Sequence, residues 1–358
     1  MHKSYLIALT TALLLASACE EESSETFVPV HGKGIVNGEV EEGFPSVVSL
    51  GGSFGGDTMS MCTGNLVTPR IVLSAAHCGD GIPIEMVQMM GRAYFGTSID
   101  EPVEEIGFSD LRIHPEYEEL VSEPGGDLGQ FDLSVFVLEE DASAEPTWFR
   151  REEVTDDDLE AELTSVGFGI TSGEGGGSGI KRSAVLTLDQ YDENFLISYV
   201  ENNPNEANIC SGDSGGPQFF NVDGFWVQGA VHSWGDQNCV YNSGSTRTDI
   251  ATEWFLDIIE EVHGTRDVCE INGWYDNGVC EPYCAELDPD CVEDTDEDTD
   301  ADGGTDGDAD TDTDADADGG VSMPGGDGCG CAVTPAGASP WSLLALLGAV
   351  LGILAVRR

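Results

Sequence analysis

Three short motifs, far apart in the chain, each present one reactive side chain in a distinctive setting. They are LSAAHC at Leu73–Cys78, FDL at Phe131–Leu133 and CSGDSGGP at Cys210–Pro217. A serine, a histidine and an aspartate can act as one unit when a fold brings them together, and several chain orders achieve this. We therefore expect His77, Asp132 and Ser214 to meet at one site.

The predicted roles of these three residues follow from the chemistry of a serine hydroxyl. A hydroxyl is a weak nucleophile at neutral pH, so it needs a base within hydrogen-bond reach. A third group must hold that base in its useful tautomer. Ser214 is then the expected nucleophile, His77 the general base and Asp132 the orienting group.

In this order, and with these neighbours, the motifs resemble those of the trypsin-like serine endopeptidases, which have the chymotrypsin fold. The resemblance runs from about Ile35 to Gly264, which predicts a protease domain at 35–264. The run LSVFVL after Asp132 matches the family's strand after its catalytic aspartate, whereas Asp127 precedes a loop. The resemblance also implies that the reaction needs no metal ion and no organic cofactor.

The same resemblance assigns the residues around the nucleophile. It implies that the backbone N–H groups of Gly212 and Ser214 stabilise the oxyanion of the tetrahedral intermediate. It implies that Asp213 pairs with the new amino group of Ile35 after an activating protease cuts the precursor. Gly34 precedes this position and Lys33 stands before it, so either the activator is not trypsin-like or a cut after Lys33 is followed by trimming.

The substrate-binding residues are also implied by the resemblance. Ser233, Trp234 and Gly235 match the segment that pairs with the substrate backbone. Asn208, six residues before Ser214, stands where trypsin has the aspartate at the base of its specificity pocket. Without that charge, a buried Lys or Arg side chain has no counter-ion, so we expect cleavage that is not strictly after basic residues.

Eleven cysteines in a chain with an export signal predict disulfide bonds. The resemblance implies the pairs Cys62–Cys78 and Cys210–Cys239. A further small Cys-rich module is expected at 265–291, and its four cysteines are Cys269, Cys280, Cys284 and Cys291. Because paired C-x2-C spacing is missing, two disulfides are favoured over a zinc site, with their connectivity left open.

Both chain ends carry targeting signals. Residues 1–18 predict a signal peptide and 19–34 a propeptide. The sequence LASAC ending at Cys19 resembles a bacterial lipobox, which predicts lipidation of Cys19, with ordinary signal cleavage as the alternative. The segment 329–358 has an apolar run before two arginines and resembles the C-terminal sorting signals of myxobacterial surface proteins, with a plain membrane anchor as the alternative.

The net charge of -55 is concentrated in one part of the chain. Residues 292–328 are rich in Asp, Thr and Gly, which predicts a disordered linker because such a segment cannot form a core. The rest of the chain is still acidic, which argues against binding nucleic acid.

Short β-type runs separated by Gly, Asn, Asp and Pro fill the protease segment and predict an all-β domain. The resemblance narrows this to two six-stranded antiparallel β-barrels with a catalytic cleft between them. Ile250–Val262 shows the only convincing helical periodicity of this segment, followed by the stop signal Gly264. After it we expect the Cys-rich module, the linker and a C-terminal apolar helix.

These observations predict an exported, envelope-attached serine endopeptidase that acts on proteins or peptides. The attachment would use the C-terminal segment and the lipidated Cys19. The alternative is a catalytically idle surface binding or adhesion protein that uses the barrel scaffold and the Cys-rich module. Idle relatives usually lose a residue of the catalytic set, and this chain retains all three.

Overall fold

The computed structural model describes residues 35–54, 57–119, 129–200, 206–281, 283–284 and 288–291. The expected signal peptide, propeptide with Cys19, acidic linker and C-terminal segment lie outside these residues. Within the described ranges, no helix combines the length and the apolar character that crossing a membrane requires.

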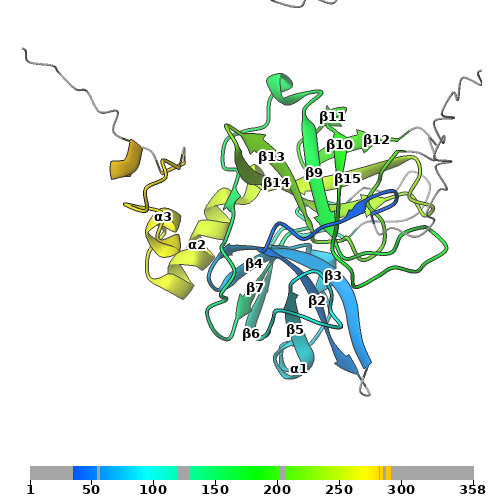
Figure 1. The fold of residues 1–358 in the computed structure, drawn as a ribbon, viewed down its shortest axis with the longest axis horizontal. Helices are drawn as coiled ribbons and strands as arrows, with labels where there is room; N and C mark the ends of the chain where they lie inside the picture. Colours follow the sequence, from blue (N-terminus) through cyan, green and yellow to red (C-terminus); the bar gives the residue numbers. More distant parts are fainter. Residues whose placement is uncertain are drawn as a thin grey trace, which may run out of the picture. The chain divides into compact units, whose positions relative to one another are not determined.

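The first half of the domain is a closed, six-stranded antiparallel barrel (Figure 1). Its strands, in chain order, are β2 (Val47–Phe54), β3 (Asp57–Thr68), β4 (Ile71–Ser74), β5 (Gly91–Phe95), β6 (Glu104–Ile113) and β7 (Ser134–Leu138). Side chains such as Leu66, Val72 and Phe108 are at most 1 % exposed and fill its interior. Burial of this apolar surface is what stabilises the barrel.

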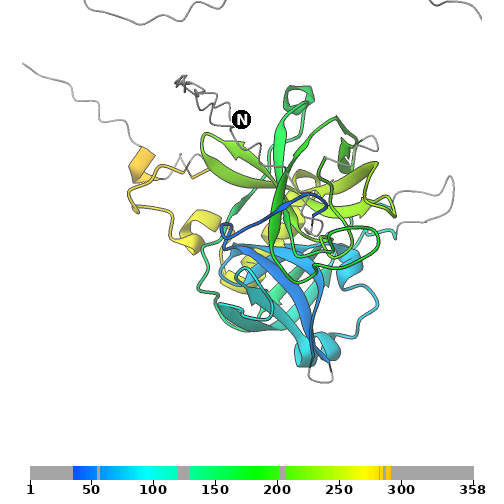
Figure 2. The same ribbon diagram turned by 45° about the vertical axis from the view of Figure 1, so that its right-hand side comes forward.

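The second half is a nine-stranded sheet, seen apart from the barrel in Figure 2. Its strands are β1 (Glu39–Val40), β8 (Trp148–Phe149), β9 (Glu162–Gly167), β10 (Arg182–Thr187), β11 (Gln190–Tyr191), β12 (Phe195–Tyr199), β13 (Pro217–Val222), β14 (Phe225–Gly235) and β15 (Asn242–Arg247). The paired order is β1-β10-β9-β13-β14-β15-β12-β11, with β8 beside β14. The mostly β architecture is confirmed, but strand pairing among the described residues does not close this sheet into the expected second barrel.

The expected C-terminal helix is present as the 3-10 turn η3 (Asp249–Ala251) followed by α2 (Thr252–His263). Gly264 ends α2 with a φ of 81°, a conformation that suits glycine. Two short helices were not predicted, α1 (Ile84–Met90) and α3 (Val268–Asn272). Each has fewer than two helical turns, which is too short for a periodic apolar pattern to reveal. The remaining 3-10 turns are η1 (Ala76–Cys78), η2 (Asp156–Asp158) and η4 (Pro289–Cys291).

The four cysteines of the expected Cys-rich module form two interleaved disulfides, Cys269–Cys284 and Cys280–Cys291. This leaves none of the four thiols for zinc. The segment is not a separate globule, because Trp274 and Cys269 belong to the same apolar cluster as Phe149 and Phe255 of the protease domain. Asn272 also donates a hydrogen bond to the Val67 carbonyl of β3, 3.0 Å away.

Candidate active site

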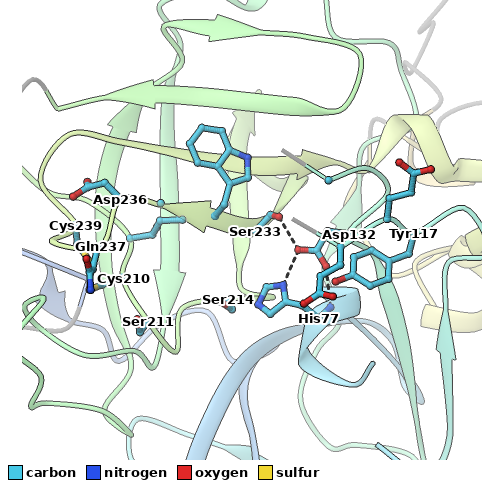
Figure 3. Close-up of a pocket in the computed structure, with 16 residues that line it drawn as sticks. His77, Tyr117, Asp132, Cys210, Ser211, Ser214, Ser233, Asp236, Gln237 and Cys239 are labelled. Carbon is cyan, nitrogen blue, oxygen red and sulfur yellow. Dashed lines mark hydrogen bonds and ion pairs between the residues drawn. A yellow bond between two sulfur atoms is a disulfide. The ribbon is translucent and has the colours of Figure 1, made fainter. Parts of the chain in front are cut away.

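His77 and Asp132 meet through two hydrogen bonds. His77 lies in η1, directly after β4, and Asp132 lies just before β7. The backbone N–H of His77 donates to Asp132 Oδ1 at 2.9 Å, and its ring Nδ1 lies 2.7 Å from Oδ2 (Figure 3). Because a carboxylate only accepts, Nδ1 carries the proton and Nε2 is left as a proton acceptor.

Asp132 is buried and receives a third donor from the second half of the domain. Only 5 % of the residue is exposed. Ser233 Oγ donates to Oδ2 at 2.6 Å, from the end of β14. The carboxylate therefore ties the first barrel to the strand that was expected to hold substrate. Three donors to one buried carboxylate compensate for its lost hydration.

Ser214 lies next to the imidazole of His77 on the wall of one cavity of about 400 Å³ (Figure 3). The Ser214 carbonyl accepts a hydrogen bond from Thr63 N at 2.8 Å, which fixes its backbone against β3. No hydrogen bond joins Ser214 Oγ to His77 Nε2 in this part of the described chain. A hydrogen bond between a nucleophile and its base often becomes short and well aligned only when substrate binds.

The turn that contains Ser214 is closed by the disulfide Cys210–Cys239. Gly212 has a φ of 93°, and a Cβ there would lie 2.9 Å from the Gly169 Cα, so a glycine is needed. Within the described residues, the N–H groups of Gly212 and Ser214 have no backbone acceptor. Both are therefore available to an oxygen atom of a ligand.

Asp213 lies between those two residues and is fully buried. Its Oδ1 accepts from Gly169 N at 2.8 Å and its Oδ2 from Cys210 N at 2.9 Å. Burial raises the pKa of Asp213 to about 7, because two backbone N–H groups replace only part of the lost hydration. Ile35 is also buried, but no hydrogen bond joins it to Asp213 in the uncut chain that the structure describes.

The expected substrate-binding strand borders the cavity, and the expected pocket base does not. Ser233, Trp234 and Gly235 all line the cavity. Asn208 is fully buried behind it, where its Nδ2 donates to the Asn242 carbonyl at 3.4 Å and its Oδ1 accepts from Ile209 N at 3.0 Å. Its amide is thus engaged by neighbouring backbone groups.

The cavity has an acidic rim that was not singled out in the sequence. Tyr117, Glu118 and Glu119 line it from the segment after β6. Burial raises the pKa of Tyr117 to about 12, so its hydroxyl stays protonated. Asp236 also lines the cavity, but its carboxylate accepts hydrogen bonds from three backbone N–H groups of the following turn and is structural.

The disulfide Cys62–Cys78 joins β3 to the turn that holds His77. Both disulfides that the family resemblance implied, Cys62–Cys78 and Cys210–Cys239, are therefore present. Comparison with protein-family models shows which family this is, because the trypsin family model matches residues 35–255. The chain belongs to the trypsin family.

Curated relatives of this trypsin-family chain are distant. It is 27 % identical over 191 residues to a trypsin of Saccharopolyspora erythraea, covering 50 % of this chain and 78 % of that protein. It is 23 % identical to spermosin of Halocynthia roretzi, covering 61 % and 59 %, respectively. It is 26 % identical to the CLIP domain-containing serine protease B10 of Anopheles gambiae, covering 58 % and 62 %. The chain thus spans about three fifths of the length of the last two relatives.

Proposed function

We propose that this protein is an exported serine endopeptidase that acts through Ser214, His77 and Asp132. The observation that supports this most strongly is the double hydrogen bond from His77 to the buried Asp132, beside Ser214 in one cavity. His77 Nε2 takes the proton of Ser214 Oγ as this oxygen attacks the scissile carbonyl. The proton then passes to the leaving amine, and water hydrolyses the acyl-enzyme by the same route.

Charge develops on the carbonyl oxygen as it becomes tetrahedral. The unpartnered N–H groups of Gly212 and Ser214 are the donors that we assign to this oxygen. Donors that are already in place need no reorganisation at the moment of reaction. Loss of one such donor typically costs about 3 kcal/mol of transition-state stabilisation.

Activation by a cut before Ile35 is part of the proposal. Ile35 has a φ of 40°, which is strained for a β-branched residue. A cut before Ile35 removes the preceding carbonyl and with it this strain. Arg182 is the one cation whose charge already lowers the pKa of Asp213 among the described residues, and the new amino group would add a cation in direct contact with this buried carboxylate.

Substrate choice in this proposal is not restricted to basic residues. Residue 208 is an asparagine, which carries no charge. The residue opposite Gly235 in the paired strand β15 is Ser243, which is also uncharged. A Lys or Arg side chain in this region would lose its hydration without a buried counter-ion.

We further propose that the protein is exported and attached to the cell envelope by the segment at 329–358, with Cys19 as a lipid site. Four disulfides among the described residues support an oxidising location. The substrates are then proteins or peptides outside the cytoplasm, and a second protease is needed for activation.

The test is labelling by a fluorophosphonate probe, which reacts with an activated serine. The protein with its N-terminus at Ile35 should be labelled, and Ser214→Ala should not. Absence of labelling in a folded protein with that N-terminus would support the idle binding scaffold instead. Cleavage of an unstructured protein such as casein provides the second readout.

A further inference from the structure

Arg182 and Asp213 are buried residues of opposite charge whose charged groups contact only the backbone. Arg182, in β10, is 6 % exposed, and Asp213, in the turn that holds Ser214, is 0 % exposed. In the described part of the chain, the guanidinium donates hydrogen bonds only to backbone carbonyls, and the carboxylate accepts only from backbone N–H groups. Buried charges are normally paired, because an isolated one is costly. The presence of both charges in one region therefore needs an explanation.

The strand register puts the two side chains on one face of the sheet. Arg182 is directly opposite Gly167 in the antiparallel pair of β9 and β10 (Figure 1). A Cβ on Gly167 would collide with Asp213 Oδ1, so the carboxylate covers this glycine. Residues directly opposite each other in an antiparallel pair point to the same face. The Arg182 side chain therefore leaves β10 on the face that the Asp213 carboxylate occupies.

The guanidinium of Arg182 is held by the loop that joins β9 to β10. Its Nη1 donates to the Gly177 carbonyl at 2.8 Å and to the Ile180 carbonyl at 2.9 Å. Its Nε is buried and has no hydrogen-bond partner among the described residues. The two carbonyls fix the position of the positive charge without neutralising it, since a guanidinium stays protonated in proteins. Arg182 is therefore a fixed positive charge with one donor unused.

The two charges influence each other in the folded chain. Burial lowers the pKa of Arg182, and the negative charge of Asp213 opposes this change. Burial raises the pKa of Asp213 to about 7, although the positive charge of Arg182 acts to lower it. Water screens buried charges much less than exposed ones, so such charges interact without direct contact. Arg182 therefore favours the ionised carboxylate before any free amino group of Ile35 exists.

The ionised form of Asp213 matters because its carboxylate supports the turn that holds Ser214. Oδ1 accepts from Gly169 N and Oδ2 accepts from Cys210 N, so each oxygen acts as an acceptor. Protonation would turn one oxygen into a donor and weaken the hydrogen bond that it accepts. The same turn presents the two N–H groups that we assign to the oxyanion. The uncut chain that the structure describes thus already has this turn in the form that the proposed reaction needs.

We propose that Arg182 is a positioning residue, which acts as the counter-ion of Asp213 in the uncut chain and gives the precursor a low activity before the cut at Ile35. The inference rests on the proposed protease function and concerns its regulation. After the cut, the amino group of Ile35 contacts the carboxylate directly and takes over this role. The charge of Arg182 should therefore matter more in the uncut chain than in the cut one.

The experiment measures how fast a fluorophosphonate labels Ser214 in the uncut full chain and in the chain cut before Ile35, with the state of this bond checked by mass spectrometry. The uncut protein should be labelled slowly but measurably. Arg182→Gln keeps an N–H donor and removes the charge. It should slow labelling of the uncut chain at least about 10-fold and that of the cut chain less than about 3-fold. Arg182→Lys keeps the charge and should restore the uncut rate to within about 3-fold.

The matched control is Lys181→Gln, at the residue directly before Arg182. Lys181 is also a buried cation, since it is 1 % exposed and its Nζ donates to the Phe44 carbonyl at 2.9 Å. Successive side chains along a strand point to opposite faces, so this charge lies on the other side of the sheet from Asp213. Lys181→Gln should therefore change the ratio of the uncut to the cut labelling rate less than about 2-fold.

Asp213→Asn is the second variant, in case Arg182→Gln does not fold. In the uncut chain it should slow labelling at least about 10-fold, and adding Arg182→Gln should slow it by less than a further factor of about 3, because both changes break one interaction. The inference is overturned if only the cut chain is labelled, if Arg182→Gln slows both forms equally, or if Asp213→Asn leaves the uncut rate unchanged. If neither form is labelled, the proposed protease function itself fails.

Discussion

The imidazole ring of His114 stacks on the phenyl ring of Phe131, with centroids 4.6 Å apart and planes within 5°. Phe131 directly precedes Asp132 and has a φ of 47°, a conformation that side-chain-bearing residues rarely adopt. The edge of Trp254 from α2 covers His114, with centroids 4.7 Å apart. The C-terminal helix is therefore linked through two aromatic contacts to the backbone that carries Asp132.

We expect Phe131→Ala to lower kcat about 10-fold with little change in KM, because the stack holds Asp132 in line with His77 and no contact to substrate is lost. Phe131→Tyr keeps the ring and should restore kcat. Steady-state kinetics with one peptide substrate measures both constants. A Phe131→Ala enzyme with unchanged kcat would show that the turn keeps its shape without the stack.

Local patterns in the sequence predicted several strands and the C-terminal helix of the protease domain. Two of the short β-type runs of the protease segment are SVVSL at Ser46–Leu50 and IVL at Ile71–Leu73. The first overlaps β2, the second lies within β4, and the periodic segment Ile250–Val262 overlaps α2. These elements depend on residues close together in the chain, so alternation or helical spacing reveals them. The closed first barrel and the approach of His77 to Asp132 are in line with what the motifs imply.

Other features depend on how distant segments pair. His232 and Ser245 meet only because β14 and β15 align in one register, and a bulge between His232 and Trp234 shifts that register. A one-residue slip would turn each side chain to the opposite face, so no local pattern could indicate this pair. The path of the nine-stranded sheet depends on pairing in the same way.

Loss of the Ser233 hydroxyl should weaken catalysis without affecting the fold. Ser233 donates to Asp132 Oδ2, the same oxygen that contacts His77 Nδ1. Without this hydroxyl, Ser233→Ala leaves a buried carboxylate with one donor fewer, and we expect kcat to fall about 5- to 20-fold. Ser211→Ala, on the same cavity wall, is the control and should change kcat less than about 3-fold. Equal effects of the two variants would contradict a special role for Ser233.

The Cys-rich segment should contribute to the stability of the whole protease domain. Trp148 of β8 contacts the rings of Trp274 and Tyr283, with centroids 5.6 Å and 5.0 Å away, and Arg151 lies 4.2 Å above its ring. Trp274→Ala leaves a cavity in this cluster, so we expect unfolding free energy to fall by about 3–5 kcal/mol in a single transition.

Denaturant unfolding followed by intrinsic fluorescence and by loss of fluorophosphonate labelling checks this. The control is Trp226→Ala, because Trp226 is 39 % exposed and should matter less. Two separate transitions, with labelling unaffected by Trp274→Ala, would mean that the Cys-rich segment is an independent module.

The buried carboxylate of Asp213 should make the uncut precursor less stable as the pH rises. Its pKa is raised by burial to about 7, above the ordinary value of about 4 that it has in the unfolded chain. The folded precursor therefore binds this proton more tightly than the unfolded chain does. Its contribution to stability is fully present below about pH 4 and is lost as the pH rises through about 7.

Thermal unfolding of the Ser214→Ala precursor between about pH 4 and about pH 8 measures this slope without self-cleavage. Many other carboxylates titrate in the same range, so the informative quantity is the difference that Asp213→Asn makes. Asp213→Asn should make stability fall less steeply as the pH rises through neutrality. The control Asp100→Asn, at an exposed carboxylate, should leave this slope unchanged. In the cut protein the new amino group of Ile35 can pair with the ionised Asp213, so the fall should be smaller there. A precursor and a cut protein with the same slope would contradict the proposed pairing, because a cation supplied by the cut must lower the pKa of the carboxylate that it meets.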